Sequence, residues 1–127
     1  MIAQDKYKYA MQNAAAWLAS IEEMLAAAKT QDNDDEHGRE IEESVLSVQV
    51  RNGWYLPGDT NPERGPDEYE ILLTTGGPAL RIYGRLNQYT EPDSAELQMQ
   101  DWGVPWERFP ASEATLLEFA SHFWFGA

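Results

Sequence analysis

Four segments of the chain alternate apolar and polar residues with a period of two, and this pattern constrains the fold more than any other feature. The segments read SVLSVQVRNGW, EYEILLTT, PALRIYGRL and SAELQMQDW. A period of two places alternate side chains on opposite faces of a β-strand, and one apolar face with one polar face is typical of antiparallel sheets. The apolar faces carry Leu46, Val48, Val50, Tyr69, Ile71, Leu73, Leu80, Ile82, Leu86, Ala95, Leu97 and Met99. We therefore expect a four-stranded antiparallel sheet within residues 44–102.

The sequence TTGGPA separates the second and third of these segments, and its paired glycines suit either a phosphate loop or a turn. A phosphate loop needs glycines between a strand and a helix whose N-terminal amides face the anion. Here an alternating segment follows Gly77, and Pro78 removes one amide donor. We therefore predict a hairpin turn at Gly76 and Gly77.

Two helices are expected to flank the strands. Residues 4–29 contain neither proline nor glycine, are rich in alanine, and repeat large apolar residues every three or four positions. Near the end of the chain, Ser112 is a suitable N-cap for a helix over 112–124. A chain of 127 residues has the size of one domain. The predicted fold is a single α+β domain, 1–127, with both helices packed on one face of the sheet.

The net charge of −13 is the strongest global signal, because 22 acidic residues stand against nine basic ones. Such a charge repels nucleic acids and anionic membranes and favours basic partners, although acidity also serves solubility alone. Residues 30–43 are interpreted as a solvated acidic linker. This linker contains Asp32, Asp34, Asp35, Glu36, Glu40, Glu42 and Glu43, and the connector after the first strand adds Asp59, Glu63, Asp67 and Glu68. Spaced carboxylates of this kind can imitate the phosphates of a duplex.

No residue pattern indicates catalysis. The chain has no cysteine, and its two histidines, His37 and His122, fall in different predicted elements, which argues against zinc. Several acids from Asp32 onwards match the spacing of a calcium-binding EF-hand loop, but Gly38 stands at the seventh position instead of the sixth. No nucleophile elbow is present, and paired carboxylates are too abundant to single out one pair. We expect a protein that is not an enzyme and holds no cofactor or metal.

The chain also lacks the features of a membrane or exported protein. No apolar run approaches the roughly 20 residues that span a bilayer. The N-terminal segment has no uninterrupted apolar core followed by a cleavage site. We therefore expect a cytoplasmic protein.

The sequence MQDWGVPWERF brings two tryptophans near each other across a turn. Two interpretations stay open for Trp102 and Trp106. The favoured one places both rings over the end of the core beneath the last helix. The other makes them anchors for a partner, because tryptophan is enriched at the energetic centres of interfaces.

Three parts of the sequence, EILLTTGGPALRIYGRL, AELQMQDWGVPWERF and FASHFWFGA, resemble a family of small acidic proteins of unassigned function. This family is encoded by proteobacterial phages and integrated mobile elements, and the resemblance covers about residues 44–127. It implies a bacterial host and a setting in which small acidic proteins counter host defence, by anti-CRISPR or anti-restriction activity. The resemblance does not imply any established biochemical activity for this chain.

Together these features lead to the hypothesis of a DNA-mimic inhibitor. It would bind a host defence complex with a basic nucleic-acid-binding surface, and neither nucleic acid nor membrane directly; a homodimer and an antitoxin role both stay open. The partner-binding residues would be Asp32, Asp34, Asp35, Glu36, Glu40, Glu42, Glu43, Trp102 and Trp106. The alternative is a small-molecule or enzymatic module on the polar sheet face around Arg81, Tyr83 and Arg85, with Gln98 and Gln100 beside them. Cross-strand pairing of these arginines with Glu70 and Glu96 is the favoured explanation of that face.

Overall fold

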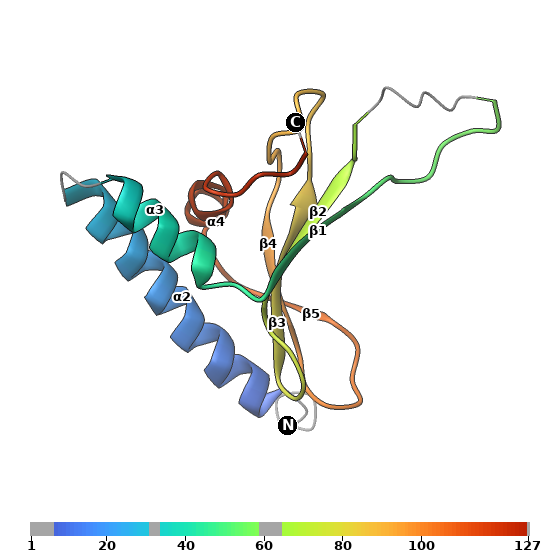
Figure 1. The fold of residues 1–127 in the computed structure, drawn as a ribbon. Helices are drawn as coiled ribbons and strands as arrows, with labels where there is room; N and C mark the ends of the chain where they lie inside the picture. The colour runs from blue at the N-terminus through green and yellow to red at the C-terminus, as the bar shows by residue number, and fades with distance from the viewer. Residues whose placement is uncertain (1–6, 31–33, 59–64, 127) are drawn as a thin grey trace.

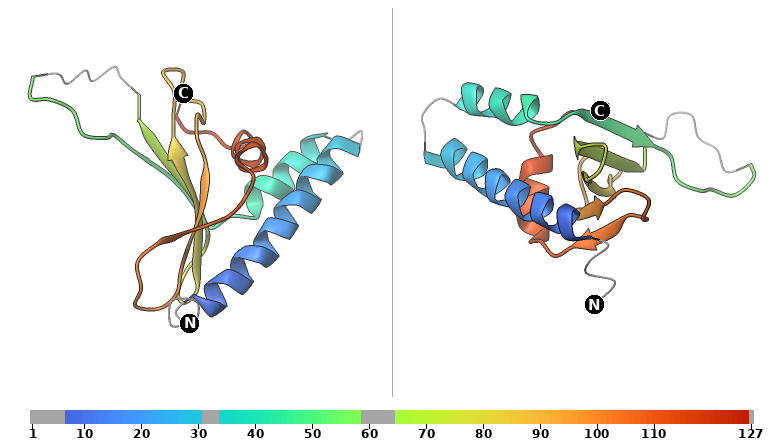
Figure 2. Two further views of the ribbon diagram at one scale, coloured as in Figure 1. Left: turned by 180° about the vertical axis from the view of Figure 1, so that it is seen from behind. Right: turned by 90° about the horizontal axis from the view of Figure 1, so that it is seen from below.

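The structure is a computed structural model that describes residues 7–30, 34–58 and 65–126. Its elements in chain order are α2 (Lys8–Thr30), α3 (Asp34–Glu43), β1 (Ser47–Arg51), β2 (Glu68–Thr74), β3 (Ala79–Arg85), β4 (Glu96–Gln100), β5 (Glu107–Phe109) and α4 (Glu113–Ala120). The strands form one sheet, and the three labelled helices lie on the same side of it (Figures 1 and 2). The predicted α+β class with an antiparallel sheet is confirmed.

The sheet is a meander in which every strand pairs antiparallel with the next one along the chain. A row of apolar residues crosses it, because Val48 lies opposite Ile71, Ile71 opposite Ile82, and Ile82 opposite Leu97. The last three of these side chains are completely buried. The alternation in the sequence therefore corresponds to one core face and one polar face.

The expected number of strands is wrong, since the sheet has five. Strand β5 pairs with β4, placing Phe109 opposite Leu97 and Arg108 opposite Gln98. Its three residues, Glu-Arg-Phe, are too few to show an alternating pattern. The pairing with β4, which local sequence does not encode, makes this segment a strand and extends the sheet past residue 102.

The expected linker over 30–43 is also wrong, because Asp34–Glu43 form the helix α3. The anchor is Ile41, whose side chain is 0% exposed and belongs to the core, and α3 packs against α2. Glutamate and arginine favour helices, so the surrounding charged residues support the helix while they remain in solvent. One apolar residue is too weak a periodic signal, and burial against α2 supplies the missing stabilisation.

Helix α2 contacts strands β3 and β4 and places small residues against them. Ala10, Ala14, Ile21 and Leu25 are buried on its inner side. The two alanines allow the first half of α2 to approach the sheet closely, and the larger side chains fill the space where α3 joins the core.

The C-terminal part of the chain completes the core. Ser112 caps α4 as predicted, accepting a hydrogen bond from the Thr115 amide at 3.3 Å. The helix ends at Ala120, which is earlier than the expected residue 124. The chain then returns so that the Phe125 ring packs on the Tyr69 ring, with 4.9 Å between the ring centroids.

Two glycines have structural roles in the hairpins. Gly76, in the β2–β3 turn, has a φ of 95°, a conformation that glycine adopts without strain. The predicted hairpin turn is confirmed. In β3, a Cβ atom on Gly84 would lie 1.9 Å from the carbonyl oxygen of Ser94, so the chain passes there only because residue 84 has no side chain.

The segment that follows β1 leaves the body of the protein (Figure 1). Residues 52–58 continue beyond Arg51 and carry Trp54, Tyr55 and Leu56, all of them exposed. We call residues 52–58 the arm.

Candidate functional site

The polar face of the sheet lies opposite the helices and carries an ordered set of charged and aromatic side chains. Cross-strand neighbours on this face are Arg51 with Glu68, Glu68 with Arg85, and Tyr83 with Glu96. The face holds four arginines (Arg51, Arg81, Arg85, Arg108) and three glutamates (Glu68, Glu70, Glu96). Among these charged side chains the basic ones therefore outnumber the acidic ones, although the protein as a whole is strongly acidic.

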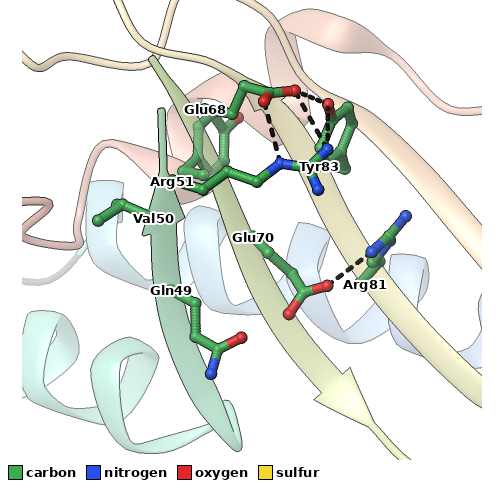
Figure 3. Close-up of a pocket in the computed structure, with 8 residues that line it drawn as sticks. Gln49, Val50, Arg51, Glu68, Glu70, Arg81 and Tyr83 are labelled. Atoms are coloured by element: carbon green, nitrogen blue, oxygen red, sulfur yellow. Dashed lines mark hydrogen bonds and ion pairs between the residues drawn. The ribbon is translucent and has the colours of Figure 1, made fainter. Parts of the chain in front are cut away.

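A first cluster on this face is built around Glu68 (Figure 3). The Arg51 guanidinium donates to both carboxylate oxygens of Glu68, from Nε at 3.0 Å and from Nη2 at 3.4 Å. The Tyr83 hydroxyl donates to the same carboxylate and accepts from Arg51 Nη2 at 3.3 Å. The three side chains come from β1, β2 and β3, so the cluster ties these strands together on the polar face.

A second cluster is built around Arg81. Its Nη1 lies 2.7 Å from Glu70 Oε2, and its Nε donates to Gln98 Oε1 at 2.7 Å. The guanidinium carbon also stands 4.2 Å from the centroid of the Trp106 ring. A stacked, charge-paired guanidinium of this kind is held in a single position. The cross-strand pairing expected for Arg81 with Glu70 is confirmed, whereas Glu96 pairs instead with Arg108, at 3.8 Å.

Shallow hollows lie between these clusters. The one drawn in Figure 3 has a volume of about 140 Å³ and is lined by the Glu68 cluster together with Gln49, Val50, Tyr69, Glu70 and Arg81. A neighbouring hollow of about 310 Å³ is lined by two arginines, Arg85 and Arg108, by three carboxylates, Glu68, Glu96 and Glu113, and by Tyr83, Gly84, Ser94 and Ala95. Among the described residues the Arg85 side chain forms no ion pair. Arg85 is therefore the side chain of this face with most capacity to bind an anion.

A different surface lies between helices α2 and α3. A groove of about 570 Å³ is lined by Trp17, Ser20, Glu23, Met24, Ala27, Glu40 and Ser44. Trp17 and Met24 are half-buried and form an apolar floor, whereas Glu23 and Glu40 are exposed at the rim. We call this hollow, with its seven residues, the α2–α3 groove.

The α2–α3 groove lies within a strongly acidic helical surface. Glu36, Glu42 and Glu43 of α3 are exposed, as is Glu22 of α2. Glu36, Glu40 and Glu43 are spaced by four and three residues, so they share one side of the helix. Such an arrangement attracts cationic side chains, and the groove offers an apolar surface for their methylene groups.

The predicted partner-binding residues do not form one surface. Asp32 lies outside the described residues, and Asp34 and Asp35 belong to α3. The remaining glutamates lie on α3, but Trp102 and Trp106 belong to the β4–β5 connection at another end of the molecule (Figures 1 and 2). The structure therefore places α3 and the two tryptophans in different parts of the molecule, and the role of these residues in partner binding stays a prediction.

The interpretation that both tryptophans cover the core beneath the last helix is wrong, and their role as anchors for a partner stays a prediction. Trp106 stacks on Arg81 on the polar face, so it does not lie beneath the last helix. Trp102 is 85% exposed, although the Cβ atom and one ring edge of its side chain lie beside Gly77 of the β2–β3 turn. Strand β5 places residue 106 on the polar face because it directs Arg108, two residues later, to that same face.

Two features of the surface escaped sequence reasoning. The floor of the α2–α3 groove uses Trp17, one of the large apolar residues whose spacing predicted the N-terminal helix. The exposed sequence Trp54-Tyr55-Leu56 received no interpretation of its own: Trp54 ends the first alternating segment, and Leu56 begins the connector that follows it. Three successive large apolar residues between Gly53 and Pro57 are the signal that could have identified the arm.

Comparison with protein-family models, with curated proteins and with solved structures found no match. Among the helices of the described residues, none combines the length and the apolar character needed to cross a membrane. No group of three or more histidines or acids with the geometry of a metal site occurs in residues 7–30, 34–58 and 65–126.

Proposed function

We propose that this protein is a non-catalytic inhibitor that binds the basic, nucleic-acid-binding surface of a host defence complex. In this proposal it is encoded by a phage or integrated mobile element and acts in the bacterial cytoplasm, as an anti-CRISPR or anti-restriction protein. It would compete with DNA or RNA for its target as a DNA mimic. The proposal rests on the acidic surface and on the family resemblance of residues 44–127.

The observation that carries the proposal is the α2–α3 groove. Its rim carboxylates, Glu23 and Glu40, flank the apolar floor of Trp17 and Met24. Lysine and arginine of a nucleic-acid-binding surface have an aliphatic stem and a cationic head, and the groove complements both parts. An arginine whose stem lies on Trp17 would gain a cation–π contact in addition to its ion pairs.

The acidic surface of α3 would extend this contact. Glu36, Glu40 and Glu43 recur along the helix axis at intervals of roughly 6 and 4.5 Å, from a rise of about 1.5 Å per residue. Their negative field would steer the basic partner and speed the encounter, and salt would weaken binding. Because Ile41 anchors α3 in the core, these carboxylates are held on a rigid element and not on a mobile linker.

The test compares two variants that lose the same charge. The first, Glu23→Gln, Glu40→Gln and Glu43→Gln, neutralises both carboxylates of the groove and the neighbouring Glu43 of α3. The control, Glu91→Gln, Asp93→Asn and Glu107→Gln, neutralises three exposed acids elsewhere. Both change the net charge from −13 to about −10. Bacteria that carry one CRISPR or restriction system each, expressing the protein or a variant, are challenged with targeted phage.

Protection of the phage by the protein and the control variant, but not by the groove variant, is the expected result. Equal protection by all three would reject the groove as the contact surface. Absence of protection against every system, with each protein expressed and folded, would reject the inhibitor proposal.

The alternative proposal is a small-molecule site on the polar face, favoured by one observation, the unpaired Arg85 beside Arg108 in the hollow of about 310 Å³. Arg51, Arg81 and Arg108 each face a glutamate within 4.0 Å, whereas Arg85 has no ion pair within residues 7–30, 34–58 and 65–126. A thermal-shift screen with nucleotides and anionic metabolites tests it. Stabilisation that Arg85→Gln abolishes would support this site, and no stabilisation by any anion would reject it.

A further inference from the structure

Strand β1 is a sheet edge whose core-facing residues are incompletely covered. Val50 lies directly opposite the buried Tyr69, on the core face of the sheet, yet it is 43% exposed. Leu46, just before β1, is 58% exposed. Val50 and Leu46 stay exposed because α2 covers the sheet at β3 and β4, nearer the other edge. An edge of this kind presents unpaired backbone groups beside an apolar strip.

The arm extends this apolar edge. Trp54 is fully exposed, at 105% of its reference area, and Leu56 is 72% exposed. Three consecutive large apolar side chains in solvent offer the isolated chain no stabilisation, and such patches mark surfaces that become covered by a partner. Figure 1 shows that the arm continues beyond β1 and away from the helices, so the two features form one extended surface.

The charge distribution indicates what can cover this surface. None of the 22 acidic residues lies between Ser44 and Gly58, and the only charged residue there, Arg51, is paired with Glu68. A second copy of a chain with a net charge of −13 is repelled from most of the surface, but it can approach along this segment. Residues 44–58 are therefore suited to contact the same residues of a second copy.

We propose that β1 and the arm form a two-fold symmetric dimer interface, in which β1 pairs antiparallel with β1 of a second copy. Antiparallel pairing of identical strands is compatible with a two-fold axis and would continue the sheet through both protomers. Residues of even number face the core side in β1, so Leu46, Val48 and Val50 of both copies would form one apolar strip. Each arm would then run along the edge of the partner, and the partner would cover the Trp54 ring of that arm.

Sedimentation equilibrium of the full chain tests this proposal. We expect a reversible dimer at micromolar concentrations, and we expect its dissociation constant to rise at least tenfold in Val50→Lys and in Trp54→Ser. The matched control is Trp124→Ser, which removes an equally apolar ring that is 78% exposed and distant from β1 in the sequence. Within the described part of the chain Trp54 does not belong to the core or pack against it, so Trp54→Ser remains informative even if Val50→Lys impairs folding.

Salt provides a second readout. Two protomers of net charge −13 repel each other, and added salt screens this repulsion, so dimerisation should strengthen as the salt concentration rises. Binding of a basic partner through the α2–α3 groove should weaken under the same change. The opposite salt dependences allow the dimer proposal and the inhibitor proposal to be supported or rejected independently.

The absence of cysteine allows the pairing to be mapped directly. Single substitutions Ser47→Cys, Gln49→Cys and Asn52→Cys are oxidised with copper phenanthroline, which takes up the two electrons released when two thiols form a disulfide. At least one of these positions should give a covalent dimer, whereas Arg108→Cys on β5 should give none. A protein that stays monomeric at every concentration and salt, or a dimer that Val50→Lys and Trp54→Ser leave unchanged, would overturn the proposal. A chain that stays monomeric but binds a foreign strand along β1 would overturn it equally.

Discussion

The Asp101 carboxylate accepts a hydrogen bond from the backbone amide of Ala10, at 3.0 Å, although 91 residues separate them in the sequence. Ala10 lies in the first turn of α2, where backbone amides have no partner within the helix. The carboxylate therefore acts as a cap supplied by the β4–β5 connection. Beside it, the Tyr7 hydroxyl donates to the Pro105 carbonyl at 3.0 Å. The predicted turn after the last expected strand thus fixes the start of α2 on the sheet.

Removal of this cap should destabilise the protein. We expect Asp101→Ala to lower the free energy of unfolding by about 1 kcal/mol, because substitution of a capping acid by alanine has that typical cost. Urea unfolding monitored by circular dichroism measures the change. Asp93→Ala, at an exposed position, is the control and should change stability by less than about 0.5 kcal/mol. Equal effects of the two substitutions would show that Asp101 does not cap α2.

Gly84 should tolerate no side chain. A Cβ atom there would stand 1.9 Å from the Ser94 oxygen and 2.9 Å from the Tyr69 ring, and these groups belong to backbone and core. We expect Gly84→Ala to cost more than about 3 kcal/mol or to prevent folding, since overpacking displaces well-packed groups. Gly38→Ala in α3 is the control: nothing lies within 4 Å of its Cβ position, so it should stabilise the protein by about 0.5 to 1 kcal/mol. A Gly84→Ala protein as stable as the wild type in thermal unfolding would contradict the tight approach.

The ion pair between Arg81 and Glu70 should be stronger than an ordinary surface pair. Both side chains are mostly covered, 21% and 24% exposed, and Gln98 and Trp106 hold the guanidinium in place. A double-mutant cycle with Arg81→Met and Glu70→Gln should give a coupling energy of about 1 to 2 kcal/mol. The same cycle on Lys29 and Glu118, at 66% and 39% exposure, should give less than about 0.5 kcal/mol. Indistinguishable couplings would mean that the Arg81 cluster adds no more than a solvated pair.

Tyr69 should make the protein less stable in alkali. Burial raises the pKa of its hydroxyl above the ordinary value of 10.0, and the negative charge of Glu113 adds to the rise. The hydroxyl also donates to the Ser94 carbonyl at 2.7 Å. Above pH 10.0 the unfolded tyrosine loses its proton while the folded one keeps it, so the free energy of unfolding falls as the pH rises.

Tyr69→Phe checks this effect in urea unfolding at several pH values. The variant should be less stable at pH 8, by about 1 kcal/mol for the lost hydrogen bond, but it should lose less stability between pH 10 and 11. Tyr89→Phe, whose ring is 67% exposed, should leave the alkaline slope unchanged. An identical slope in all three proteins would contradict the assigned cause.

The sequence by itself determined the strands β1 to β4, the turn at Gly76, the helix that became α2 and the N-cap at Ser112. Each depends on neighbours within a few residues: alternation along a strand, a glycine with positive φ, an apolar stripe on a helix, a hydroxyl near the first helical turn. The pairing of Arg81 with Glu70 also followed from strand alternation, because both strands were recognised.

The tertiary structure decided everything that depends on contacts between distant segments. Helix α3 forms where a linker was expected because burial of Ile41 against α2 offsets the cost of ordering an acidic segment. Strand β5 forms because β4 offers it an edge, and that edge places Trp106 on Arg81 instead of beneath α4. The α2–α3 groove and the exposed arm are equally products of packing, since neither a hollow nor an uncovered side chain exists until the elements around it have been placed.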